Sequence, residues 1–175
     1  MKVKISAKAL ISFVLVVVLS GCGYTAHLKM PDGMQSIYVP NFENAISASE
    51  RYTYVSGLEI DITNAVIDRI LYDGNLKLVD KDFADMILQG KVVRYEQEAV
   101  RYNSIEGVQQ YRLFVVVSIE LVKRESGEVI WEEGNFTGDA EYFIEGSNAV
   151  SERTACDNAI NDLAKNIVDR IVEDW

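Results

Sequence analysis

The sequence predicts an α+β domain in which two helices pack on one face of a mixed, mostly antiparallel sheet. Two segments repeat apolar residues at the three- and four-residue spacing of an amphipathic helix. The other segments alternate apolar and polar residues, as strands with one buried face do. They follow one another in the order β-α-β-β-β-β-α, without an internal repeat. This order predicts a single-domain sandwich of helices on a sheet.

The first expected strand covers residues 35–42. Pro40 lacks a backbone N–H group, so this strand either lies at a sheet edge or ends near that residue. A polar loop is expected over residues 43–55, and a second short strand over residues 76–80. Strand, helix and strand within about 45 residues predict a βαβ unit with parallel strands.

The first helix is expected to begin at Ser56, because Ser56 and Glu59 have the spacing of a capping box. Gly74 can end it, since glycine readily adopts the left-handed conformation of a helix terminus. One side of this helix is apolar, with Leu58, Ile62, Val66 and Ile70 at four-residue intervals.

Three long strands are expected over residues 86–102, 110–124 and 129–143, joined by short turns as an antiparallel meander. Gly90 is a candidate position for a bulge in the first of them. Aromatic residues are candidates for the sheet face opposite the helices; some of them must belong to the core, and if several point outward they form an apolar partner surface. They are Tyr95, Tyr102, Tyr111, Phe114, Trp131, Phe136 and Tyr142.

The second helix is expected over residues 148–175. Its polar side is acidic, whereas helices that lie on membrane surfaces tend to be rich in Lys and Arg, so packing against the sheet is favoured. Its apolar side consists of Cys156, Ile160, Leu163, Ile167, Ile171 and Trp175, which makes Cys156 a small buried hydrophobic residue.

The amino terminus has the organisation of a secretory signal. Three lysines precede an apolar run over residues 9–19, which is shorter than the roughly 20 residues that span a bilayer. Residues 19–22, Leu-Ser-Gly-Cys, look like a bacterial lipobox, in which the Cys22 thiol accepts diacylglycerol and the freed amine a further acyl chain such as palmitate. Gly23 in place of an aspartate favours sorting to the outer membrane.

These features divide the chain into three parts. Residues 1–21 are expected to be a lipoprotein signal peptide, residues 22–35 a lipidated tether, and residues 36–175 a periplasmic α+β domain on the periplasmic face of the outer membrane. Cleavage would remove three of the 17 basic residues and none of the 27 acidic ones, so the formal charge would change from −10 to about −13. An acidic domain of this kind is a poor nucleic-acid binder, because phosphate contacts need Lys and Arg.

Catalytic and metal-binding patterns are missing from the sequence, so we expect neither enzyme activity nor a cofactor. The one histidine, His27, lies in the expected tether, far from any nucleophile of the domain. One histidine and one unacylated cysteine do not make a zinc site. Glu96 and Glu98 share a strand face, but in a solvated strand they are expected to be surface charges.

Several segments resemble, in order, the LptE family of lipopolysaccharide-assembly lipoproteins. Such a protein sits inside a large outer-membrane β-barrel, LptD, helps that barrel to fold, and contacts lipopolysaccharide on its way to the outer leaflet. By this resemblance, Arg101 is the nearest match to a basic position that contacts lipopolysaccharide, with Arg112 on the neighbouring strand. The segments that carry the likeness are residues 19–24 with Leu28, residues 36–42, residues 84–90 and residues 171–175.

Two other kinds of lipoprotein share some of these features. An accessory or pore-forming lipoprotein of a curli-type secretion channel also has a lipobox, an early βαβ unit and an Ala-Asp-x-x-Leu-x-Gly strand. It would assemble as a ring of many copies, whereas an LptE-like protein binds one barrel. A structural lipoprotein with an unrelated envelope partner is the other alternative.

Overall fold

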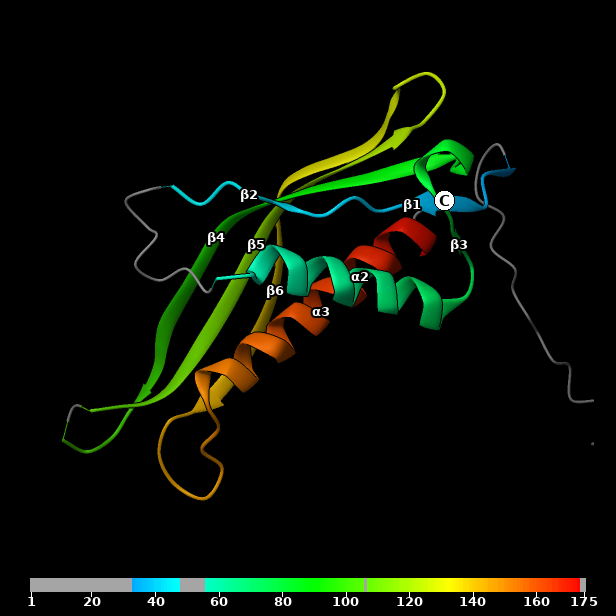
Figure 1. Cartoon of the computed structure of the whole chain (residues 1–175). Helices are drawn as coiled ribbons and strands as arrows, with labels where there is room; N and C mark the ends of the chain where they lie inside the picture. Colours follow the sequence, from blue (N-terminus) through cyan, green and yellow to red (C-terminus); the bar gives the residue numbers. More distant parts are fainter. Residues whose placement is uncertain (1–32, 48–55, 106, 174–175) are drawn as a thin grey trace, which may run out of the picture.

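The computed structural model describes residues 33–47, 56–105 and 107–173, which form a six-stranded sheet with two helices on one of its faces (Figure 1). The predicted lipid attachment residue Cys22, the tether residues up to 32, and Trp175 lie outside these ranges. The elements are β1 (Ser36–Tyr38), β2 (Glu43–Asn44), α2 (Leu58–Asp73), β3 (Lys77–Leu78), the 3-10 turn η3 (Lys81–Phe83), β4 (Met86–Tyr102), β5 (Val108–Lys123), β6 (Val129–Phe143) and α3 (Glu152–Glu173).

The strand order is β3-β1-β4-β5-β6, with β2 beside β4. β1 is parallel to both of its neighbours, β3 and β4, which confirms the predicted parallel pairing of the βαβ unit. β4, β5 and β6 form the predicted antiparallel meander. Figure 1 shows that the hairpin of β4 and β5 is long and that its tip projects beyond the helices. The predicted α+β fold class is therefore confirmed.

The first strand ends before Pro40, at Tyr38, and lies inside the sheet rather than at its edge. The prediction of a polar loop from residue 43 onwards was wrong at its start. Glu43 pairs with Lys91 in a further parallel strand, β2. The reason lies in Phe42, which is buried over Gly90: a Cβ atom at that glycine would lie 2.0 Å from the Phe42 ring. Gly90 thus serves close packing, and the expected bulge occurs instead between Val92 and Arg94.

The helix ends follow backbone geometry more than side-chain capping. The predicted capping box is not formed; α2 begins after Gly57, which has a left-handed φ of 88° and no side-chain cap. Gly74 ends this helix as predicted, with φ 75° and its N–H donated to the Ile70 carbonyl. α3 begins later than expected, at Glu152, where the Ser151 hydroxyl accepts a hydrogen bond from the Thr154 N–H at 3.1 Å.

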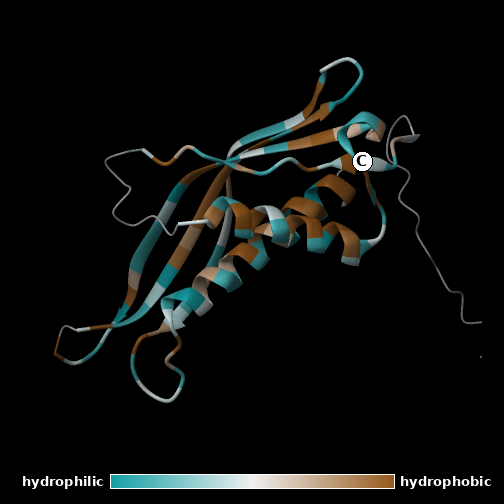
Figure 2. Ribbon diagram, in the orientation of Figure 1, coloured by the Kyte–Doolittle hydropathy of each residue, from teal (hydrophilic) through white to brown (hydrophobic). Residues whose placement is uncertain are grey.

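The core lies between the sheet and the two helices, and Figure 2 shows hydrophobic residues concentrated on β5 and on α2 and α3. Gly138 of β6 allows α3 to approach closely, since a Cβ atom there would lie 2.4 Å from the Ala159 oxygen and from the Leu163 nitrogen. The prediction of several aromatic residues on the sheet face opposite the helices was wrong for most of them, although Phe114 does lie there. Tyr95 and Tyr142 are buried in the core, and the partly buried Tyr111, Trp131 and Phe136 pack against it.

Candidate functional site

The candidate site is the face of the sheet that α2 and α3 leave uncovered, here called the outer face. Its side chains alternate along β4, β5 and β6 with those of the core and are mostly polar or charged. Across the three strands the residues stand in rows, which the pairing register defines. The outer face includes Gln89, Lys91, Arg94, Glu96 and Glu98 of β4, Arg112, Phe114, Val116, Ser118 and Glu120 of β5, and Thr137, Asp139 and Glu141 of β6.

Arg112, one of the two predicted ligand residues, is held by acidic neighbours on β6. Its guanidinium forms ion pairs with Asp139, at 3.4 Å, and with Glu141. The Gln110 amide donates a further hydrogen bond of 2.8 Å to Glu141. Two carboxylates therefore already neutralise the guanidinium of Arg112. The sequence did not reveal this, because these partners lie about 30 residues away along the chain.

Arg101, the other predicted residue, lies nearby and has a different environment. It pairs with Gln110 across β4 and β5, and its guanidinium carbon lies 5.7 Å from the centre of the Phe143 ring. Among the residues that the structure describes, Arg101 has no ion-pair partner, and its side chain is exposed. The fold thus brings the two arginines to the same end of the sheet but leaves only Arg101 open to an anionic ligand.

Exposed apolar side chains surround this end of the sheet, here called the distal end, where β4 turns into β5. Tyr102 pairs with Val108, and the Ile144 N–H donates to the Gln109 carbonyl at 3.1 Å, which joins the hairpin to the chain that follows β6. An open cation beside apolar groups suits an amphipathic ligand better than a free ion. The exposed residues are Val100, Tyr102, Ile105, Ile144 and Val150.

A tyrosine cluster fixes the start of α3 to the sheet at the same end. The Tyr95 hydroxyl donates to the Glu152 carboxylate at 2.8 Å, and the Tyr142 hydroxyl donates to the Gln97 side chain at 3.2 Å. Burial raises the pKa of both tyrosines, so the hydroxyls remain protonated donors. Burial likewise raises the pKa of the neighbouring Cys156 thiol to about 11, as expected of a small core residue without thiolate character.

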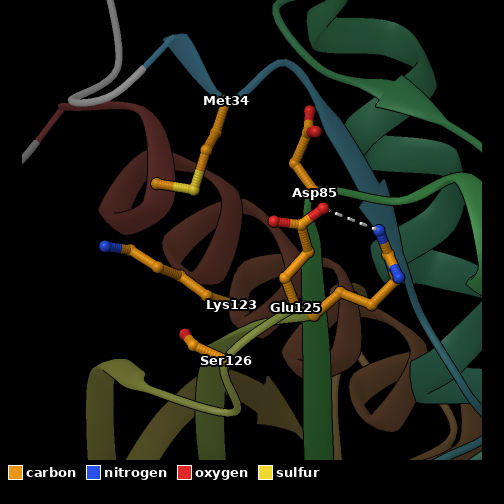
Figure 3. A pocket seen from close by; sticks show the side chains of 6 residues that line it. Met34, Asp85, Lys123, Glu125 and Ser126 are labelled. Carbon is orange, nitrogen blue, oxygen red and sulfur yellow. Dashed lines mark ion pairs between the residues drawn. The ribbon is translucent and has the colours of Figure 1, made fainter.

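At the opposite end of the sheet, a hollow of about 260 Å³ marks a junction between β1, β4 and the β5–β6 turn (Figure 3). The Asp85 carboxylate accepts hydrogen bonds from the Gln35 and Ser36 N–H groups and from the Ser36 hydroxyl, at 2.7–3.0 Å. These donors lower the pKa of Asp85, the Gln35 N–H most of all. Arg124 donates to the Ala84 carbonyl at 2.6 Å and pairs with Glu125 at 3.5 Å.

The charged groups of this junction are therefore occupied by the protein itself. Lys123, which also lines the hollow, pairs with Glu128 at 3.0 Å. The junction holds the chain at the point where it leaves the expected tether and enters the sheet. The sequence showed the Ala84-Asp85 pair as part of a family likeness, but not that its carboxylate binds β1.

Two further properties follow from the described part of the chain. Within it, no group of three or more His, Cys, Asp or Glu side chains has an arrangement that could hold a metal ion. None of the helices described is both long and apolar enough to cross a membrane.

Comparisons with solved structures support the fold. A protein of Xanthomonas campestris superposes with a TM-score of 0.53 at 12% identity, over 77% of this chain and 81% of that one. A hypothetical protein of Chlamydia trachomatis gives 0.52 at 12%, over 79% and 95%. A minor lipoprotein of Acinetobacter baumannii gives 0.50 at 15%, over 79% and 93%. At such identities the likeness shows the fold alone.

Comparison at the level of sequence identifies the family. A search of curated protein sequences gives no match. The family model for lipopolysaccharide assembly, LptE, matches residues 34–175, which include every element of the sheet and both helices. Asp85 binds the start of β1, and Gly90 packs against Phe42. All of these residues lie within the match. The chain belongs to the LptE family of lipopolysaccharide-assembly proteins.

Proposed function

We propose that this chain is an outer-membrane lipoprotein, acylated at Cys22, that binds an LptD-like β-barrel translocon and assists the insertion of lipopolysaccharide into the outer leaflet. Residues 1–21 would be removed as a signal peptide, and residues 22–35 would link the lipid to the periplasmic domain. The role is that of an accessory protein without catalysis. The family match supports lipopolysaccharide assembly, and the polar outer face is the observation that favours a barrel partner.

A protein that fills a barrel needs a polar surface, because the interior of an outer-membrane barrel is polar. The outer face meets this need: its arginines are matched by carboxylates, as in the pair of Arg94 and Glu96 at 3.3 Å. Five strands side by side span roughly 20–25 Å, and the helices add a layer of roughly 10 Å. Eight-stranded barrels are filled by their own side chains, so only a much larger barrel could hold this domain.

Arg101 is the residue that we propose for lipopolysaccharide contact. A guanidinium can bind a phosphate through two parallel hydrogen bonds, and that of Arg101 has no carboxylate partner among the described residues. The exposed apolar groups of the distal end would lie beside the acyl chains. Arg112 has the same charge but is bound to Asp139 and Glu141, so we expect it to stabilise the outer face rather than to bind the ligand.

Co-purification tests the barrel partner. A carboxyl-terminal tag, mild detergent and mass spectrometry should recover one large β-barrel protein at one-to-one stoichiometry. Recovery of a homo-oligomeric ring would instead indicate a pore-forming lipoprotein, and recovery without any barrel would contradict the proposal.

Matched arginine variants test the ligand contact. We expect Arg101→Gln to weaken binding of fluorescent lipopolysaccharide to the purified protein about three- to tenfold, because an open charge-assisted contact is lost. Arg112→Gln removes the same charge and should change this affinity less than twofold. Equal losses in the two variants would mean that only net charge matters.

A further inference from the structure

A second hollow, of about 280 Å³, opens on the outer face where β1 and β2 lie beside β4. β1 pairs with β4 as far as Tyr38 and Ile87, and β2 resumes the pairing only at Glu43 and Lys91. Between these points the chain passes Pro40, where the strand has ended, and sends the Phe42 ring into the core over Gly90. The gap between the two pairings is the origin of the hollow, here called the edge hollow.

The polar groups of the edge hollow differ from those of the junction because they are largely unoccupied. Within the described ranges, neither Lys81 nor the side chains of Asn41 and Gln89 have a hydrogen-bond or ion-pair partner. Lys91 pairs with Glu43 at 3.5 Å, but both side chains are more than half exposed, so this ion pair is weak and can exchange for another anion.

The balance of charge in the edge hollow is positive, although the chain as a whole carries a formal charge of −10. Two ammonium groups, of Lys81 and Lys91, face one carboxylate, of Glu43. Amide groups of Asn41 and Gln89 can both donate and accept hydrogen bonds, as sugar hydroxyls require. Half-buried Tyr38 and Pro40 add apolar surface on which a sugar ring can lie.

We propose that the edge hollow binds a phosphorylated sugar unit of a glycolipid, with the phosphate between the lysines and the sugar ring against Tyr38. The volume suits one sugar rather than a whole headgroup, since pockets for larger ligands run from roughly 300 to 1,000 Å³. This inference rests on the proposed role in lipopolysaccharide assembly and adds a second contact, on the β1 side of the sheet and separate from Arg101.

The test is a titration of the full mature lipoprotein in detergent micelles, followed by NMR of the backbone amides of Gln89, Gly90 and Lys91. Glucose 6-phosphate should shift these signals to saturation, whereas glucose and inorganic phosphate should act much more weakly. An equal response to inorganic phosphate would overturn the proposal in favour of a simple anion site. Absence of any saturable shift would overturn it as well.

Three variants make the test specific. Lys81→Gln should raise the dissociation constant for glucose 6-phosphate about fivefold, since one charge-assisted contact is lost. Lys77→Gln, with the same charge change on an exposed residue of β3 outside the hollow, should leave it unchanged. Glu43→Gln should lower it, because Lys91 is released and a repulsive carboxylate removed. Equal weakening by the two lysine variants, or weakening by Glu43→Gln, would contradict the proposal.

The result of the glucose 6-phosphate titration can be distinguished from the result of the co-purification that tests the proposed function. Lys81 lies outside the distal end and the β4–β6 rows of the outer face, so Lys81→Gln should still co-purify with the barrel at one-to-one stoichiometry. A failed titration with the barrel retained would refute the edge hollow alone, whereas loss of the barrel from the unmodified protein would refute the proposed function.

Discussion

Single carboxylates decide much of the local order in this protein. Asp85 binds Gln35 and Ser36, at the start of β1, through three hydrogen bonds, and so fixes the position at which the chain enters the sheet. Asp139 and Glu141 bind Arg112, one of the two arginines that the family resemblance suggested for ligand binding. In each case the partner lies far away in sequence, and the pairing register brings it within reach.

The junction at Asp85 should make stability depend on pH. Its pKa is lowered in the folded protein, so its contribution is complete above the unfolded value of about 3.9 and is lost as the pH falls through the lower folded value. The wild type should therefore exceed Asp85→Asn in urea midpoint at pH 6, and this difference should shrink by pH 3. Asp82→Asn, which changes an exposed carboxylate of η3, is the control. A difference that stays constant from pH 6 to pH 3 would refute this role.

Strand β4 connects the two halves of the sheet. Its first residues pair with the parallel strands β1 and β2, while its whole length pairs with β5 in the antiparallel direction. Glycines fit other segments against the strands: Gly90 makes space for Phe42, and Gly138 makes space for the backbone of α3. Gly90 was predicted to allow a bulge, but the role of both glycines is close packing.

The packing of α3 on β6 should be sensitive to a single methyl group. In Gly138→Ala the added Cβ would overlap the helix backbone at Ala159 and Leu163, so we expect a loss of about 1–3 kcal/mol of unfolding free energy. Gly134→Ala is the matched control, because a Cβ there has no neighbour within 4 Å and should change stability by less than about 0.5 kcal/mol. Urea titration of both variants gives the comparison, and equal stabilities would show that α3 can shift freely.

The point at which the chain enters the sheet and the proposed ligand site at Arg101 lie at opposite ends of the sheet. β4 has 17 residues and spans roughly 55 Å from the junction to the distal end. Cys22 precedes Ser36 by 14 residues, which can span at most about 50 Å. A domain whose lipid-bearing segment joins the sheet at the junction would thus have Arg101 at the far end of β4.

The proposed lipid anchor at Cys22 can be tested by substituting each of the two cysteines of the chain separately. Intact mass measurement of the membrane protein should show loss of residues 1–21 and addition of acyl chains in the wild type. Cys22→Ala should show neither, because the acceptor thiol is absent. Cys156→Ala should retain both modifications, since Cys156 is buried in the core. Processing and acylation of the Cys22→Ala variant would exclude this anchor.

Local sequence patterns were enough to predict the fold class, the order of the long elements and the end of α2 at Gly74. Each of these depends on residues close together along the chain, whose periodicity or conformational freedom can be read directly. Only the folded structure established the presence of β2, the start of α2 after Gly57, the inward direction of five of the seven aromatic candidates, and which arginine lacks a carboxylate partner among the described residues. These depend on contacts between distant strands, where a register set by the whole sheet determines which charges and rings meet.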